Sequence, residues 1–269
     1  MFVSHNGIIV PKNEANIAVD NIEFTYGFGV YENLKIRNSQ IHFINAHLDR
    51  LMQSADMIGL EHTFTKPQIQ AWLAALREKN AAVAANVKIL LIGGQTKTDA
   101  NIYIMTLSPK FPEKKVYRQG VRAITRQFER FLPQAKTLNM LPSYLFYRAA
   151  ENAGAHDTLL IDRHGCILEG TRSNFFALKE KTLYTAPLER VLNGVTRQQV
   201  VAMAKEHNYA LAETAVALKN IADYDGAFLT HTSGGVVPIK SVDDFSFPAI
   251  ATELKELMRR YDDYVSQII

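Results

Sequence analysis

Apolar residues in the first third of the chain follow strand-like spacing in several short runs. Phe2 to Val10 reads as two short strands joined at Asn6-Gly7, a pair that tolerates the positive φ of a tight hairpin turn. A glycine-punctuated turn then leads into a strand over 30–36, and a hairpin tip with a return strand is expected over 37–43. Apolar runs at 87–92 and 102–107 predict two further strands.

Two segments between these strands have helical periodicity. Apolar residues at helical spacing over 46–58, followed by Gly59, predict a helix with a glycine stop. A second helix is expected after Thr65, which suits the N-cap position, with Pro67 in the first turn. Strands and helices mixed in this way predict a small α+β domain.

The C-terminal part of the chain is richer in predicted strands. Residues 108–115 contain two prolines and a charge cluster, which indicate a linker, so we predict domains at 1–115 and 116–269. The expected strands cover 121–126, 158–168 folded over a turn at 162–165, 174–178 and 181–184; the expected helices cover 143–152, 196–207 and 249–266.

Composition narrows the class of protein. The 269 residues are 47% apolar, which is ample for the core of a folded protein, and 30 basic against 27 acidic residues do not imply nucleic-acid binding. The pI near 8.8 fits a protein that handles anionic small molecules. A single cysteine, Cys166, cannot form an internal disulfide, and neither a signal peptide nor a membrane-spanning run is visible. We therefore expect a cytoplasmic protein, with no metal site.

The order of four motifs carries the functional information. These are Lys136-Thr-Leu-Asn139, Glu169-Gly-Thr-Arg-Ser-Asn174-Phe-Phe176, Leu183-Tyr-Thr185 and Leu192-Asn-Gly-Val-Thr-Arg197. Their order and spacing closely resemble the class IV, or fold-type IV, pyridoxal-phosphate (PLP) enzymes, which include branched-chain and D-amino-acid aminotransferases and aminodeoxychorismate lyase. The resemblance implies an α+β fold with a small N-terminal domain, a larger strand-rich C-terminal domain, PLP between them, and a homodimer.

Two residues would act directly on the cofactor if the resemblance holds. Lys136 occupies the position of the lysine that forms a Schiff base with PLP and shuttles a proton at the substrate α-carbon. Glu169 matches the acid beside the pyridine nitrogen, where a carboxylate favours the protonated ring. The simpler alternatives are a solvated surface lysine and an ordinary hairpin-end acid.

The resemblance also implies how the phosphate is bound. Arg50 matches the family's phosphate-binding arginine, although an exposed helix arginine is the alternative. Val195 and Thr196 open a predicted helix whose N-terminal amides suit a phosphate, while Thr196 alone could be an N-cap. Thr232 and Ser233 resemble a second phosphate loop, in a type of glycine-rich turn that often binds nothing.

Candidate substrate contacts are Tyr31 and Arg172. Tyr31 matches a tyrosine that faces cofactor and substrate, although half-buried strand tyrosines are common. The Arg-x-His carboxylate trap of well-known D-amino-acid enzymes is absent after 87–92, and Arg172 could replace it through bidentate binding or form a structural ion pair instead. Lys97 and Arg37 are further candidates.

The leading hypothesis is an aminotransferase of the D-amino-acid branch that uses a 2-oxo acid. Glu32 after Tyr31 is typical of the aminotransferases, and Met140 departs from the Lys-x-Leu-Asn-Tyr form of several branched-chain members. The alternative is aminodeoxychorismate lyase, which releases pyruvate and 4-aminobenzoate for folate synthesis. A PLP-binding protein without turnover, or a plain interaction domain, is the hypothesis from another class.

Overall fold

The computed structural model describes residues 1–268 and divides into two compact units. Unit 1 consists of Met1–Lys110 and Ala135–Asn139, and unit 2 consists of Phe111–Gln134 and Met140–Ile269. The chain therefore returns to unit 1 for the five residues that include Lys136. The predicted domain division at residue 115 remains a prediction.

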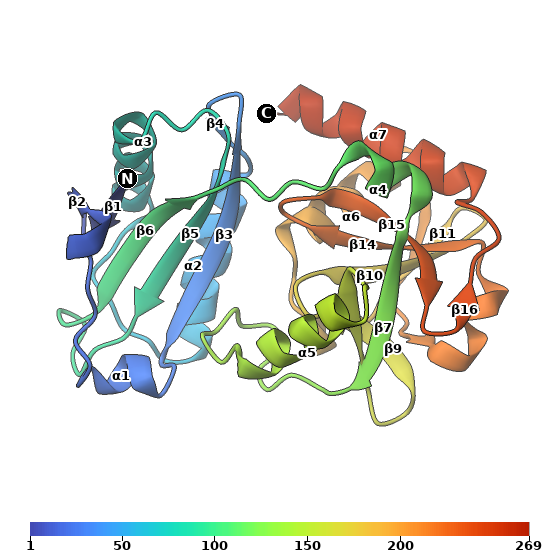
Figure 1. The fold of residues 1–269 in the computed structure, drawn as a ribbon, viewed down its shortest axis with the longest axis horizontal. Coiled ribbons are helices and arrows are strands. Elements are labelled where there is room, and N and C mark those ends of the chain that lie inside the picture. The colour runs from blue at the N-terminus through green and yellow to red at the C-terminus, as the bar shows by residue number, and fades with distance from the viewer. Residues whose placement is uncertain (269) are drawn as a thin grey trace. The chain divides into compact units, whose positions relative to one another are not determined.

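Unit 1 is built on a six-stranded sheet, blue to green in Figure 1, in the order β2-β1-β6-β5-β3-β4. Its elements are β1 (Phe2–His5), β2 (Ile8–Pro11), α1 (Ile22–Thr25), β3 (Gly29–Arg37), β4 (Gln40–Ile41), α2 (Ile44–Met57), α3 (Lys66–Lys79), β5 (Ala85–Ile92) and β6 (Asn101–Leu107). The predicted hairpin between β1 and β2 is confirmed, with φ of 50° at Asn6 and 89° at Gly7.

Helices α2 and α3 cover one face of this sheet. Alternate residues of β3 (Val30, Leu34 and Ile36) pack with Leu48 and Leu51 of α2 in one buried cluster. The predicted start of α3 is confirmed, because the Thr65 side chain accepts a hydrogen bond from the Gln68 amide in a capping box. The residues between those of β3, such as Tyr31, lie on the opposite face of the sheet.

Unit 2 contains a ten-stranded sheet that curls into a barrel-like ring (Figure 1). Its strands are β7 (Val121–Gln127), β8 (Asp157–Ile161), β9 (Cys166–Gly170), β10 (Asn174–Lys179), β11 (Thr182–Tyr184), β12 (Ala210–Ala212), β13 (Val216–Ala217), β14 (Gly226–His231), β15 (Gly235–Val242) and β16 (Phe245–Ser246). The ring runs β10-β14-β15-β7-β8-β9, and the pairing of Asn174 with Glu169 closes it. The ring brings β9, β10 and β14 side by side.

Successive side chains along these strands point to opposite faces of the sheet, and the two faces form two separate hydrophobic cores. Phe175 of β10 and Leu229 of β14 belong to a cluster drawn from all six ring strands, so this cluster fills the ring. Phe176 and Phe228 point the other way and stack, with ring centroids 5.0 Å apart, beneath helices α6 and α7. The helices are α4 (Lys114–Gln119), α5 (Leu141–Asn152), α6 (Val195–Glu206) and α7 (Thr252–Ile268).

Several elements differ from the sequence expectations. The 108–115 linker is not structureless to its end, because α4 begins at Lys114 and packs Val116 and Tyr117 against the ring core. The expected return strand over 37–43 is only two residues long, because the chain turns at Phe43, which has a φ of 53° and is the N-cap of α2. Strands β14 and β15 were not predicted, although they lie in the middle of the sheet.

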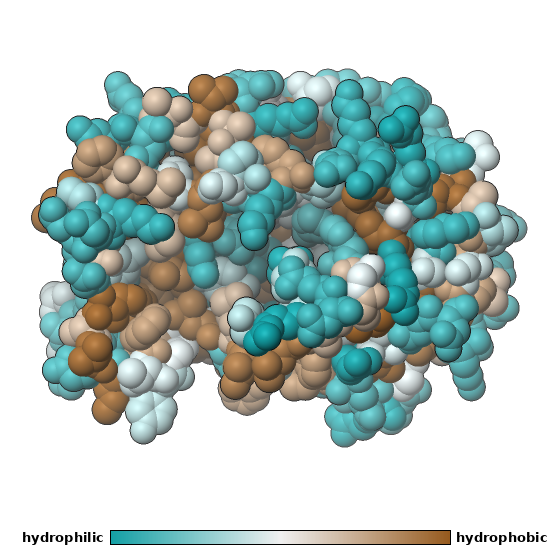
Figure 2. All heavy atoms as spheres, in the orientation of Figure 1, coloured by the Kyte–Doolittle hydropathy of each residue, from teal (hydrophilic) through white to brown (hydrophobic). Residues whose placement is uncertain are grey.

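The surface of unit 2 has an exposed apolar region over the first turns of α5. Figure 2 shows hydrophobic residues there, and Leu141, Tyr144 and Leu145 are all more than half exposed. Apolar patches of this kind often mark contact surfaces.

Within residues 1–268, no helix has both the length and the apolar character needed to span a bilayer.

Candidate active site

In unit 1, the segment that carries Lys136 is hydrogen-bonded along the start of β3. The Tyr31 amide donates to the Lys136 carbonyl at 3.0 Å, and the Leu138 amide donates to the Gly29 carbonyl at 2.9 Å. A Cβ at Gly29 would lie 2.7 Å from the backbone oxygen of Leu91 on β5 and 2.7 Å from a methyl of Leu138, so the close approach requires glycine. The Lys136 amide also donates to the Ser54 hydroxyl at 3.1 Å. The backbone at Lys136 is thus held independently of its side chain.

The Lys136 side chain lies against an aromatic ring. Its Nζ atom is 4.4 Å from the centroid of the Tyr31 ring. The Nζ atom of Lys88, on β5, is 5.6 Å from the same centroid. Tyr31 pairs with Leu90 across β3 and β5, and Lys88 is two residues before Leu90, so Tyr31 and Lys88 share a sheet face. Two amines therefore flank one tyrosine on the face that α2 and α3 do not cover.

On the other face of the sheet, which α2 and α3 cover, Arg50 belongs to a buried triad with Glu32 and His47. Arg50 Nε lies 2.6 Å from Glu32 Oε1, and its Nη2 donates to Glu32 Oε2 at 2.8 Å. The Nδ1 atom of His47 is 2.8 Å from the same Oε2. Arg50 is 6% exposed and Glu32 fully buried, so the alternative of an exposed helix arginine is wrong.

The neighbouring charges keep Glu32, the central residue of this triad, ionised. Burial alone would raise the pKa of Glu32, but Arg50 and His47 outweigh it and hold the pKa at about 2. Burial lowers the pKa of His47 from its ordinary value. In β3, alternate residues face the core, and Glu32 occupies one of these core-facing positions. A carboxylate at such a position needs a cationic partner, and this is the sequence signal that could have identified the pair. His47 precedes Arg50 by three residues, on the same face of α2.

In unit 2, Glu169 is held by two separate segments. Arg130 Nε lies 2.9 Å from Glu169 Oε1, and the Leu192 amide donates to Glu169 Oε2 at 3.2 Å. Glu169 is 4% exposed. A buried carboxylate beside a guanidinium, with one oxygen accepting a hydrogen bond from an amide, is held in a defined orientation. Sequence reasoning missed Arg130, which lies in an irregular segment without a pattern.

Strand pairing places Glu169 beside Asn174 and Thr230. Asn174 is opposite Glu169 of β9 and Thr230 of β14, so the three side chains share one sheet face. Asn174 Nδ2 donates to the Leu192 carbonyl at 2.7 Å. The Thr230 hydroxyl is buried and has no hydrogen-bond partner among the described residues. A buried donor without a partner is costly, so this hydroxyl is suited to meet a ligand.

Helix α6 begins beside these residues. Gly194 is the N-cap, and a Cβ there would lie 2.0 Å from Asn174 Oδ1, so only glycine fits. Val195 and Thr196 are the first helical residues and are buried, hence the alternative of Thr196 as N-cap is wrong. The Thr196 hydroxyl shares a hydrogen bond with Tyr261 of α7. The first amides of this 12-residue helix have no intrahelical acceptor and favour an anion.

The remaining candidates of unit 2 lie in turns. Thr232 and Ser233 are half-buried in the turn between β14 and β15, directly after Thr230 and His231. Arg172 is exposed in the turn between β9 and β10, and its guanidinium carbon lies 3.4 Å from the centroid of the Tyr147 ring. Its observed contact is therefore aromatic stacking, and no ion pair with it is present within residues 1–268.

The candidates thus form two groups, one in each unit. Unit 1 brings together Lys136 and Tyr31, with Arg50 on the adjacent helix, and adds Lys88, Glu32 and His47. Unit 2 brings together Glu169 and the start of α6 through Leu192 and Asn174, and adds Arg130 and Thr230. The roles assigned to Lys136, Glu169, Arg50, Val195, Thr196, Thr232, Ser233, Tyr31 and Arg172 remain predictions.

The architecture, an α+β sheet unit and a barrel-like sheet unit, is that of the fold-type IV PLP enzymes. Residues 29–242 match the family described as Amino-transferase class IV. A D-alanine aminotransferase of Bacillus licheniformis is 30% identical, covering 90% of this chain and 89% of that protein. A branched-chain-amino-acid aminotransferase of Pseudomonas aeruginosa is 26% identical, covering 97% and 92%.

Solved structures show the same fold. A hypothetical aminotransferase from Mycobacterium tuberculosis in its PLP-bound form superposes with a TM-score of 0.87 and 21% identity, covering 100% of both chains. A putative 4-amino-4-deoxychorismate lyase from Legionella pneumophila has a TM-score of 0.84 and 23% identity, covering 94% of this chain and 97% of that one. The chain belongs to the class IV aminotransferase family and is a PLP-dependent enzyme.

The residues present fit PLP. The cofactor needs an amine, a carboxylate for its ring nitrogen and donors for its phosphate. Lys136 provides an amine on an aromatic face, and Glu169 is a buried, oriented carboxylate. The start of α6 and the buried Thr230 hydroxyl provide donors. Each requirement of the cofactor therefore has a matching group in the chain.

Proposed function

We propose that this enzyme is an aminotransferase of the D-amino-acid branch, which moves an amino group between an amino acid and a 2-oxo acid. The observation that carries the proposal is the Lys136 amine, 4.4 Å from the Tyr31 ring centroid on a backbone hydrogen-bonded to β3. The similarity to the D-alanine aminotransferase of Bacillus licheniformis supports the choice of branch.

Each candidate residue has a task in this proposal. Bound PLP supplies an electron sink that stabilises charge at the substrate α-carbon. Lys136 attaches the cofactor and moves the α-proton through its Nζ atom. Glu169 holds a proton at the ring nitrogen, with its orientation set by Arg130 and the Leu192 amide.

Phosphate and substrate would be bound by the other candidates. Arg50, the amides of Val195 and Thr196, and the Thr232–Ser233 turn would bind the phosphate. Tyr31 would face the substrate. Arg172 would bind the substrate carboxylate, for which its guanidinium must exchange stacking on Tyr147 for bidentate hydrogen bonds.

Lys88 favours an oxo acid with a second carboxylate as one of the substrates. Its Nζ atom and that of Lys136 contact the same Tyr31 ring, so they are no farther apart than the sum of the two distances, about 10 Å. No carboxylate pairs with Lys88 within residues 1–268. A lysine without an acidic partner, close to the reactive amine, is suited to the distal carboxylate of a dicarboxylic 2-oxo acid.

Replacing Lys88 by methionine is therefore expected to raise the KM for dicarboxylic 2-oxo acids by roughly tenfold, the effect of losing a hydrogen bond to a charged group. The KM for pyruvate, which has no distal carboxylate, should change less than about twofold. Steady-state kinetics with both acceptors measure this. Lys35→Met, on the same face of β3, is the control. Equal effects on both acceptors would contradict the assignment.

The alternative is 4-amino-4-deoxychorismate lyase, which the fold likeness to the Legionella pneumophila structure keeps in consideration. Purified enzyme is incubated with aminodeoxychorismate without an oxo acid, and separately with D- or L-amino acids and a 2-oxo acid. We expect amino transfer with the D-enantiomers and no release of 4-aminobenzoate. Release of pyruvate and 4-aminobenzoate without an acceptor would contradict the aminotransferase proposal.

We also propose that the enzyme is a homodimer in the cytoplasm. The exposed apolar residues at the start of α5 support a protein contact surface. Sedimentation of the purified enzyme at several concentrations tests the dimer.

A further inference from the structure

We propose that Arg190 is a positioning residue for Glu169. This inference rests on the proposed role of Glu169 beside the cofactor ring nitrogen. Two chain segments hold the Glu169 carboxylate, one through the Arg130 guanidinium and the other through the Leu192 amide. Arg190 ties these two segments to each other and to the turn that precedes Glu169.

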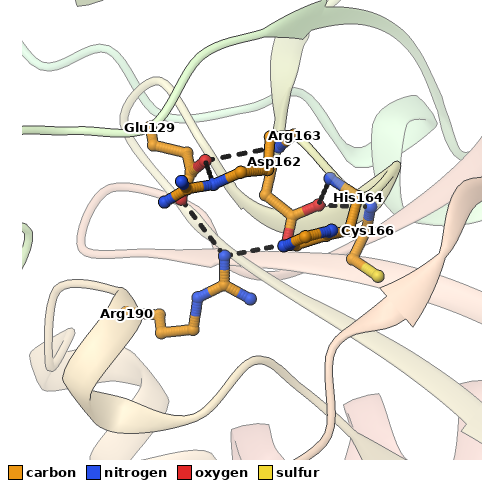
Figure 3. Close-up of polar contacts among 6 residues, drawn as sticks. All are labelled: Glu129, Asp162, Arg163, His164, Cys166 and Arg190. Atoms are coloured by element: carbon orange, nitrogen blue, oxygen red, sulfur yellow. Dashed lines mark hydrogen bonds and ion pairs between the residues drawn. The ribbon is translucent and has the colours of Figure 1, made fainter.

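The contacts of Arg190 are shown in Figure 3. Its Nη2 atom donates to Glu129 Oε2 at 3.2 Å and to Asp162 Oδ2 at 2.7 Å. Glu129 is the residue before Arg130, and Arg190 is two residues before Leu192. One nitrogen therefore cross-links the segment that supplies the guanidinium with the segment that supplies the amide.

Asp162 provides a rigid anchor for this cross-link. It lies at the turn between β8 and β9, and its side chain is only 1% exposed. Asp162 Oδ1 accepts from the amides of His164 at 2.9 Å and Cys166 at 2.8 Å. Burial would raise the pKa of Asp162, but these donors and Arg190 lower it, so it is an anion at neutral pH. Arg190 thereby connects the loops around Glu169 to a fixed charge.

Arg163 provides a matched comparison within the same cluster. Its Nε atom lies 3.2 Å from Glu129 Oε1, but its side chain is 75% exposed and it contacts neither Asp162 nor the 190–192 segment through its side chain. Removing Arg163 takes away a Glu129 partner without releasing Leu192. Removing Arg190 releases both the segment that carries Arg130 and the segment that carries Leu192.

The experiment compares Arg190→Met with Arg163→Met by titrating the apoenzyme with PLP and with the PLP analogue that has carbon in place of the ring nitrogen. The analogue removes the group that Glu169 would meet. We expect Arg190→Met to weaken PLP binding by roughly tenfold and Arg163→Met by less than about twofold. With the analogue, wild type and Arg190→Met should bind alike. Arg190→Lys, which keeps one charged donor, should restore most of the PLP affinity.

A second readout separates positioning from plain stabilisation. Thermal midpoints of the apoenzyme and the PLP-bound enzyme are compared for each variant. Loss of stability alone lowers both midpoints equally, whereas loss of positioning reduces the upward shift caused by PLP. If Arg190→Met does not fold, Glu129→Gln, which weakens one of the two contacts, is tested in the same way. Weakened binding of PLP and analogue alike, or equal effects of Arg190→Met and Arg163→Met, would overturn the proposal. A wild type that does not bind PLP would instead refute the proposed function.

Discussion

Replacement of Lys136 by alanine is expected to lower kcat/KM for amino transfer by at least about ten-thousand-fold, because the variant loses both the amine that attaches PLP and the base that moves the α-proton. The fold should survive. The hydrogen bonds at position 136 to Tyr31 and Ser54 are made by the backbone, and the side chain lies against the Tyr31 ring. Loss of such a contact costs only about 0.5–1 kcal/mol.

Borohydride reduction followed by mass spectrometry of peptides checks the chemical basis of this result. In the wild type, the cofactor mass should be fixed on the peptide that contains Lys136, and in Lys136→Ala no peptide should carry it. Lys88→Ala is the control, because Lys88 lies against the same aromatic ring but has no predicted bond to the cofactor. Cofactor fixed on Lys88 in the wild type, or on any lysine of Lys136→Ala together with retained turnover, would show that the reactive amine was misassigned.

Much of the fold could be predicted because the signals are local. Asn6-Gly7 predicts its hairpin, and Thr65 with Pro67 predicts the start of α3, since each depends on residues within one turn. The misses depend on distant contacts. Residues 226–231 are almost uniformly buried, so β14 has no alternation to reveal it. Helix α4 is short and highly charged, and packing of Val116 and Tyr117 against the ring core stabilises it.

The residues of the candidate site also fall into those that local motifs predict and those that depend on contacts between distant parts of the chain. Residue order alone, through the motifs of the family, predicts Lys136, Glu169 and the Gly194-Val195-Thr196 helix start as candidates. The groups that orient them come from far along the chain, as Arg130 is 39 residues from Glu169 and Arg190 is 61 from Glu129. No local pattern encodes such pairings. The exception is Glu32, whose position among core-facing residues of β3 already requires a buried cationic partner.

That requirement leads to the largest expected effect on stability. Glu32→Ala should destabilise the enzyme by about 3–5 kcal/mol, because it removes the carboxylate that two nitrogens of the buried Arg50 guanidinium contact. Denaturant unfolding measures the free energy. Asp49→Ala, which removes the exposed pair with Lys66 on the same helix, should cost no more than about 1 kcal/mol. The double variant Glu32→Leu, Arg50→Met should recover much of the loss, since the buried carboxylate and the buried guanidinium are removed together.

The free energy of unfolding in acid should also depend on the triad of Glu32, Arg50 and His47. The pKa of Glu32 is about 2 in the folded protein and near 4.5 in the unfolded chain, so the folded state binds its proton less readily. The stabilisation from ionised Glu32 is complete above pH 4.5 and is lost as the pH falls toward 2. Over that window the wild type should lose about 3 kcal/mol that Glu32→Gln, which has no proton to bind, does not lose. Parallel curves of unfolding free energy against pH for the two proteins would show that Arg50 and His47 do not hold Glu32 as an anion.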